Sequence, residues 1–119
     1  MEGSRHNETE VSDYIADHIA EWGIRDVFTV TGGGAMHMND AFGHHPKLHC
    51  TYQHHEQACA MAAEAYARMD NRMAAVCVTT GPGATNAITG VLGGWMDSIP
   101  MLVFSGQARY ATTVAASGL

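Results

Sequence analysis

The stretch Ala74-Ala75-Val76-Cys77-Val78-Thr79-Thr80-Gly81-Pro82-Gly83-Ala84-Thr85-Asn86 decides the fold. Its first six residues are small, apolar or β-branched, which predicts a strand over 74–79 that is buried on both faces. Gly81-Pro82-Gly83 breaks this strand, and the residues that follow predict a helix over 84–96. A strand that passes at once into a helix is typical of an α/β fold.

The same alternation continues on both sides of this stretch. Asn7 and Glu10 have the spacing of a capping box, apolar residues then recur at helical spacing from Val11, and Gly23 marks the helix end. Further on, the patterns predict strands over 26–31, 48–52 and 101–105 and helices over 35–42 and 55–69. This order predicts a parallel sheet with helices on both faces.

Three loops follow the carboxyl ends of the predicted strands, at 31–34, 53–56 and 80–83. Open parallel sheets bind ligands at this edge. Glu56 opens an alanine-rich helix there, where a glutamate also interacts well with the helix dipole. In the third loop, amides at a helix N-terminus suit a polar or anionic group, and Gly83 would let a flat ring approach the backbone. For this loop, a plain tight turn that binds no ligand stays open as the alternative.

Length and composition narrow the function classes. The chain has 119 residues, of which 46% are hydrophobic and 15% charged, so one globular domain is expected, over 8–119, after a leader or loose arm at 1–7. The net charge of −6 and six scattered basic residues argue against nucleic acid as a partner. No apolar run approaches the roughly 20 residues of a membrane span and no secretory signal is visible. A cytoplasmic protein is therefore expected.

Cysteines, histidines and small residues say less about function than the loops do. Cys50, Cys59 and Cys77 are odd in number and lack C-x-x-C spacing, which predicts buried free thiols. Five of the eight histidines lie within 44–55, but without the spacing of a metal site, so no metal is expected in this chain. The alanine-rich helix at 55–69 and the glycines of the next helix favour a subunit interface.

Gly32-Gly33-Gly34 raises a nicotinamide alternative. A dinucleotide-binding turn would read G-x-G-x-x-G, but His37 stands at the third glycine position. Glu56 lies near the distance at which an acidic residue binds the ribose, so an NAD-binding Rossmann domain stays a remote alternative.

Five segments together resemble the N-terminal, pyrimidine-binding domain of thiamine diphosphate-dependent enzymes, acetolactate synthases above all. They are His55-Glu56-Gln57-Ala58, Ala63-Glu64-Ala65-Tyr66-Ala67-Arg68, Thr80-Gly81-Pro82-Gly83-Ala84-Thr85-Asn86, Asp97-Ser98-Ile99-Pro100 and Ser105-Gly106-Gln107. Pyruvate oxidase, benzoylformate decarboxylase and oxalyl-CoA decarboxylase are relatives in that family. The resemblance runs from about Val11 to Gln107.

The resemblance implies a role for each matched position. Glu56 would hydrogen-bond N1′ of the aminopyrimidine ring and act as the acid–base relay that helps the cofactor lose its C2 proton. The cofactor-binding residues would be Glu56, Thr80, Pro82, Gly83 and Asn86, and the substrate side would be formed by Gly33, Gly34 and Gln107. The enzyme would decarboxylate a 2-keto acid and transfer the resulting acyl carbanion.

The resemblance also implies what this chain does not supply. Magnesium and the diphosphate are bound in the family through Gly-Asp-Gly and a downstream Asn, which are absent here. The domain therefore looks truncated, and a diphosphate-binding domain is expected in a longer chain or a partner subunit, within a homo-oligomer that is at least a dimer. FAD is allowed by the family, although no motif here indicates it.

The first turn departs from the family pattern. Acetolactate synthases tend to have Tyr-Pro-Gly-Gly where this chain has Val30-Thr31-Gly32-Gly33-Gly34. This difference leaves the keto acid open. A thiamine-dependent decarboxylase subunit and a non-catalytic assembly or cofactor-binding module are therefore kept as alternatives.

Overall fold

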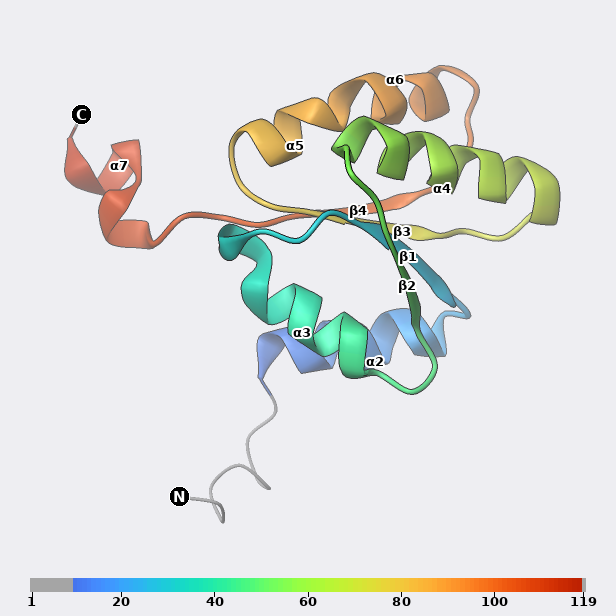
Figure 1. Ribbon diagram of the computed structural model, residues 1–119, viewed down its shortest axis with the longest axis horizontal. Coiled ribbons are helices and arrows are strands. Elements are labelled where there is room, and N and C mark those ends of the chain that lie inside the picture. The colour runs from blue at the N-terminus through green and yellow to red at the C-terminus, as the bar shows by residue number, and fades with distance from the viewer. Residues whose placement is uncertain (1–9, 119) are drawn as a thin grey trace, which may run out of the picture.

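A four-stranded parallel sheet forms the centre of the molecule (Figure 1). The structure is a computed structural model and describes residues 10–118. The strands are β1 (Asp26–Thr29), β2 (His49–Tyr52), β3 (Ala75–Val78) and β4 (Leu102–Ser105). Their order across the sheet is β2-β1-β3-β4, and every neighbouring pair is parallel. β3 is buried along its whole length, as expected for a central strand between two helical layers.

Helices cover both faces of the sheet (Figure 1). One layer contains α2 (Val11–Glu21) and α3 (Met36–His44), which follows a 3₁₀ turn, η1 (Gly33–Ala35). The other layer contains α4 (Glu56–Asp70), α5 (Pro82–Asn86) and α6 (Ile88–Met96). The described chain ends with η2 (Tyr110–Thr112) and α7 (Val114–Ser117). The predicted α/β fold with a doubly covered parallel sheet is thus confirmed.

Two apolar clusters form the core, one on each side of the sheet. Ile19, Val27 and Phe42 belong to the cluster under α2 and α3. Cys59 and Val76 belong to the cluster under α4. Alanines dominate the second cluster, which lets α4 lie close to the strands.

The element bounds differ from the predicted ones in several places. α3 runs through Gly43 to His44, beyond the predicted end at residue 42. The helix predicted over 84–96 is two helices, and the first begins earlier because Pro82 occupies its N1 position, where a missing N–H costs little. They separate at Ala87, whose N–H bonds the carbonyl of Ala84 three residues back. η2 and α7 were not predicted.

The helix expected after Asn7 begins later than the capping-box pattern predicts. α2 starts at Val11, and Glu10 occupies the N-cap position without a side-chain hydrogen bond. Asn7, the expected cap, lies outside the described residues. At the other end, Gly23 adopts a left-handed φ of +90° directly after the helix, so the predicted end is confirmed.

The small residues of α4 and α6 pack against each other within the chain. A Cβ added at Gly90 would lie 2.5 Å from Ala60 Cβ and 3.0 Å from the backbone nitrogen of Met61. Ala60 and Ala63 are themselves fully buried. Close packing inside the domain therefore explains the small residues at these positions, and the subunit interface expected from the composition stays a prediction.

The cysteines and the histidines clustered at 44–55 have ordinary surroundings. All three cysteines are free; Cys59 and Cys77 are buried as predicted, whereas Cys50 is only half-buried. Three histidines of the 44–55 segment pair with aspartates: His44 with Asp40, His45 with Asp17, and His49 with Asp26. Residues 10–118 contain no cluster of three or more His, Cys, Asp or Glu placed to hold a metal. Among them, no helix is long and apolar enough to cross a membrane.

Candidate cofactor site

Glu56 is the first residue of α4, just beyond the carboxyl end of β2. Its side chain is buried, with the residue only 9% exposed. His55 caps the helix, because its Nδ1 accepts a hydrogen bond from the N–H of Gln57 at 3.0 Å. The helix start is therefore held without using the carboxylate of Glu56. A buried carboxyl group that is not needed as a cap is available for another partner.

Asn86 supplies the partner of one carboxylate oxygen. It is the last residue of α5, and its Nδ2 donates to Oε1 of Glu56 at 3.1 Å. The two residues are 30 positions apart in the sequence. Among the described residues, the structure records no hydrogen bond to Oε2 of Glu56. The carboxylate is thus held at one oxygen and open at the other.

Thr79 joins the loops after β1 and β3. Its Oγ1 accepts a hydrogen bond from the N–H of Gly34 at 3.0 Å. A Cβ added at Gly32 would lie 2.5 Å from Thr79 Cβ, and one added at Gly83 would lie 2.6 Å from Thr79 Cγ2. Glycine is required at these positions because a larger residue would collide with Thr79, which packs against both the loop after β1 and its own turn.

This contact changes the explanation of Gly83. The sequence suggested that glycine here leaves room for a flat ring. Gly83 is instead buried against the methyl group of Thr79. A Cβ at Gly83 would also lie 3.7 Å from Oε2 of Glu56, so Gly83 belongs to the wall beside the open oxygen. Its position next to the candidate site stands, although the physical reason for glycine differs.

The loop after β4 lies beside the loop after β1 at the carboxyl edge of the sheet. The N–H of Gln107 donates to the carbonyl of Gly34 at 3.2 Å, and Gly106 packs directly against that carbonyl group. The side-chain Oε1 of Gln107 accepts from the N–H of Ala108 at 2.8 Å. Gly33, by contrast, is exposed, and a Cβ added there would meet nothing within 4 Å.

The predicted site residues fall into two neighbouring groups. Glu56, Gly83 and Asn86 form the first. Gly34 and Gln107 form the second, together with Thr80, whose Cγ2 lies 2.8 Å from a Cβ added at Gly34. Thr80 therefore lies with the residues expected on the substrate side. Gly33 and Pro82 are exposed, and Pro82 opens α5.

Thr79 is the residue that sequence reasoning missed. It lies between the two groups and contacts glycines of both. The pair Thr79-Thr80 gives no sequence signal of which hydroxyl turns toward the first loop, because that depends on where the preceding strand ends. β3 ends at Val78, one residue before the predicted end, and both threonines lie in the loop.

Cys59 lies one turn after Glu56 and is not a nucleophile at neutral pH. Burial of the thiol, together with the nearby Glu56 carboxylate, raises the pKa of Cys59 to about 11. Cys77 on β3 has its pKa raised to about 11 as well, mainly by burial. Reactive cysteines require the opposite shift, because the thiolate is the reactive form. Neither thiol is therefore a candidate nucleophile at this edge of the sheet.

Residues 9–117 match the family described as thiamine pyrophosphate enzyme, N-terminal TPP binding domain. The chain belongs to this family. Membership replaces the remote alternative of an NAD-binding Rossmann domain. His37, which broke the glycine pattern, is an exposed residue in the first turn of α3.

Several curated relatives of this TPP-enzyme domain are acetolactate synthases. The large subunit from Lactococcus lactis is 36% identical over 99 residues, covering 83% of this chain and 17% of the relative. The large subunit from Buchnera aphidicola of Schizaphis graminum is 45% identical over 96 residues, covering 81% and 17%. Acetolactate synthase 2 of Zea mays, a chloroplastic protein, is 38% identical over 96 residues, covering 81% and 15%. The chain thus spans about one sixth of the length of these relatives.

The geometry around Glu56 fits the pyrimidine half of thiamine pyrophosphate. A ring nitrogen needs a hydrogen-bonding carboxyl group that is sheltered from water and fixed in direction. Glu56 is buried, is held at Oε1 by Asn86, and offers Oε2 beside the bare backbone of Gly83. Residues that could hold this half of the cofactor are therefore present.

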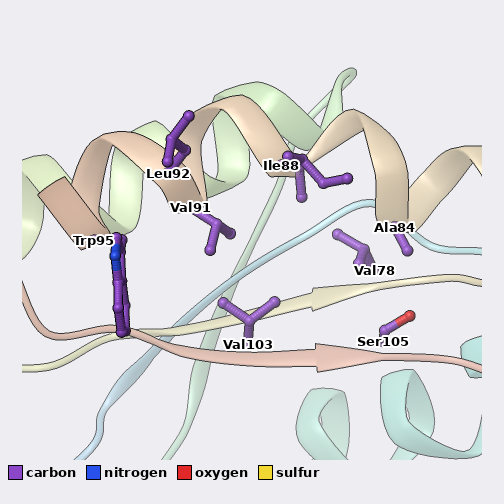
Figure 2. Close-up of a pocket in the computed structure, with 9 residues that line it drawn as sticks. Val78, Ala84, Ile88, Val91, Leu92, Trp95, Val103 and Ser105 are labelled. Atoms are coloured by element: carbon purple, nitrogen blue, oxygen red, sulfur yellow. The ribbon is translucent and has the colours of Figure 1, made fainter.

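A separate apolar groove of about 390 Å³ lies between α6 and residues of β3 and β4. Figure 2 shows Val91 and Trp95 of α6 pointing toward the strand that carries Val103. Glu56, Gly83 and Asn86 are not among its lining residues. It offers almost no polar groups, whereas a small-molecule site needs some to fix orientation. We therefore place the candidate site at the loops and not in this groove.

Proposed function

We propose that this chain forms the pyrimidine-binding part of an acetolactate synthase-like enzyme. Such an enzyme decarboxylates a 2-keto acid and transfers the acyl carbanion to an acceptor. The observation that supports this most directly is the buried Glu56 carboxylate with Asn86 on Oε1 and Oε2 open. Relatives named acetolactate synthase support the same reaction class.

Each residue of the first group has a chemical task in this proposal. Thiamine diphosphate, when bound, supplies the carbanion chemistry that amino-acid side chains lack. Glu56 shares a proton with the pyrimidine N1′ and so acts as a general acid–base group. Burial keeps water from competing for Oε2, which strengthens that hydrogen bond. Gly83 closes the wall beside it.

The second group orients the keto acid. Gly34, Thr80 and Gln107 lie together where the loops after β1, β3 and β4 meet. Backbone hydrogen bonds hold these loops, so polar groups at this point keep a fixed direction when a substrate arrives. Gly33, in the loop after β1, is exposed.

The proposal also includes partners. A diphosphate-binding domain, in the same longer chain or in a partner subunit, would hold Mg²⁺ and the charged end of the cofactor. The working unit would be a homo-oligomer of at least two copies. FAD stays allowed as a further cofactor, with no residue here that indicates it.

The test is turnover by the complete protein that contains this chain. Pyruvate, thiamine diphosphate and Mg²⁺ are supplied, and carbon dioxide and the organic product are measured separately. Acetolactate formed in step with carbon dioxide, only when thiamine diphosphate is present, supports the proposal. Carbon dioxide with free aldehyde would instead support the thiamine-dependent decarboxylase, which the unusual Val30-Thr31 turn keeps in view. Cofactor binding without turnover of any 2-keto acid would favour a non-catalytic module.

A further inference from the structure

The amide of Asn86 reaches the carboxylate of Glu56 from a rigid position. α5 begins with Gly81 at the N-cap and Pro82 at N1. The N–H of Thr85 bonds the carbonyl of Gly81 at 3.0 Å, and Thr85 Oγ1 donates to the carbonyl of Pro82 at 3.3 Å. The short turn is thus fixed by its own hydrogen bonds. Its last residue can hold a partner on α4 in one place.

The chemistry of the contact determines which carboxylate oxygen is left. Nδ2 of an asparagine can only donate, so its partner must be an acceptor. Oε1 of Glu56 is that acceptor. Oε2 then projects toward Gly83, at 3.7 Å from where a Cβ would stand. Without Asn86, a glutamate side chain with several rotatable bonds would lose this fixed direction.

We propose that Asn86 is a positioning residue that acts through Glu56 and aims Oε2 at the pyrimidine N1′. This differs from the direct ring contact that the family resemblance suggested for Asn86. The inference rests on the proposed function, because it needs Glu56 to bind N1′. It assigns the specificity for a ring nitrogen at that point to the Asn86–Glu56 pair, not to the glutamate alone.

The experiment measures cofactor binding in the complete protein by titration calorimetry. Two probes are used with Mg²⁺: thiamine diphosphate and an analogue in which the pyrimidine N1′ is replaced by C–H. The variants are Glu56→Gln, Asn86→Leu and Asn86→Asp, which keeps the size of asparagine but lacks the N–H donor. Thr85→Val is the matched control, because Thr85 precedes Asn86 on α5 and bonds only within the turn.

The inference predicts a loss that depends on N1′. Asn86→Leu and Asn86→Asp should each weaken binding of thiamine diphosphate roughly 10–150-fold, the scale of a lost hydrogen bond to a charged group. Binding of the analogue should change less than about twofold, because it has no N1′ for Glu56 to meet. Thr85→Val should alter neither affinity. A residue needed only for folding would weaken both probes alike.

Two failures can be told apart. If both Asn86 variants weaken the two probes equally, or change neither, the positioning role is overturned while the role of Glu56 stands. If the unsubstituted protein binds thiamine diphosphate and the analogue equally well, and Glu56→Gln changes nothing, the proposed function itself has failed. Thermal unfolding of each variant shows whether it is folded. If Asn86→Leu does not fold, the test relies on Asn86→Asp.

Discussion

The N–H of Gly34 donates a hydrogen bond to Oγ1 of Thr79 at 3.0 Å, joining two loops that are 45 residues apart in the sequence. Gly34 lies with the groups expected near the substrate, and Thr79 precedes the turn that leads to Gly83 and Asn86. The contact therefore fixes the loop expected on the substrate side against the loop expected on the cofactor side. Two substitutions at position 79 distinguish the contribution of the hydroxyl group to stability from that of the methyl group.

Thr79→Val should destabilise the first loop by leaving the N–H of Gly34 without its acceptor. An unpaired, partly buried donor costs roughly 1–3 kcal/mol. Thr79→Ser keeps the acceptor and removes the methyl group that packs on Gly83, for roughly 1 kcal/mol. Urea unfolding measures both losses. Hydrogen exchange at the Gly34 amide should speed up in Thr79→Val and stay near its original rate in Thr79→Ser. Equal exchange in the two variants would contradict the hydrogen-bond explanation.

The placement of Glu56 could be predicted from the sequence, whereas its partner could not. Hydrophobic runs and glycine-rich turns are local signals, so they located the four strands and put Glu56 beyond the end of one of them. The bond from Asn86 depends on how far α4 and α5 are apart, which is a property of the packed domain. For the same reason Thr79 escaped notice, since its role appears only when three glycines lie against it.

The glycines of α6 show the same limit of prediction from sequence. Their small size indicated close packing, but not which element packs against them. Gly90→Ala should destabilise the domain by roughly 1–3 kcal/mol, the usual cost of overpacking. The added Cβ would lie 2.5 Å from Ala60 Cβ and 3.0 Å from the Met61 backbone, which cannot move without shifting α4. Denaturant unfolding measures the change.

Gly93→Ala is the matched control on the same helix. The atom nearest to its Cβ would be Oε2 of Glu64, at 3.5 Å, which is ordinary contact. Alanine is a better helix former than glycine by roughly 0.8–1 kcal/mol, so this variant should be equally stable or more stable. Destabilisation of both variants by the same amount would show that α6 does not pack on α4 as described.

Buried thiols should make the domain sensitive to alkaline pH. Burial raises the pKa of Cys77 from 9.0 to about 11, so folding favours the neutral thiol. This contribution to stability is complete below about pH 9 and is lost as the pH rises through about 11. The free energy of unfolding should therefore fall between these values, and less steeply in Cys77→Ala. Parallel curves for the two proteins would remove Cys77 as a cause.

A thiol reagent gives a second measurement of the same property. At pH 8 Cys59 and Cys77 should stay unmodified in the folded protein, because both are buried and their pKa values are about 11. In denaturant all three cysteines should react. Rapid modification of Cys59 without unfolding would mean that the start of α4 opens readily, which would contradict the buried surroundings of Glu56.

Glu56→Gln should abolish most of the activity of the complete protein while preserving the fold. Glutamine keeps the size of the side chain and can still accept the bond from Asn86, but it cannot exchange a proton with N1′. Turnover should fall by roughly 10²–10⁴-fold, the usual contribution of general acid–base catalysis. Glu64→Gln is the control on the same helix, because Glu64 pairs with Arg68 away from the site, at 2.9 Å. Near-normal turnover in Glu56→Gln, or an equal loss in Glu64→Gln, would remove Glu56 from the chemistry.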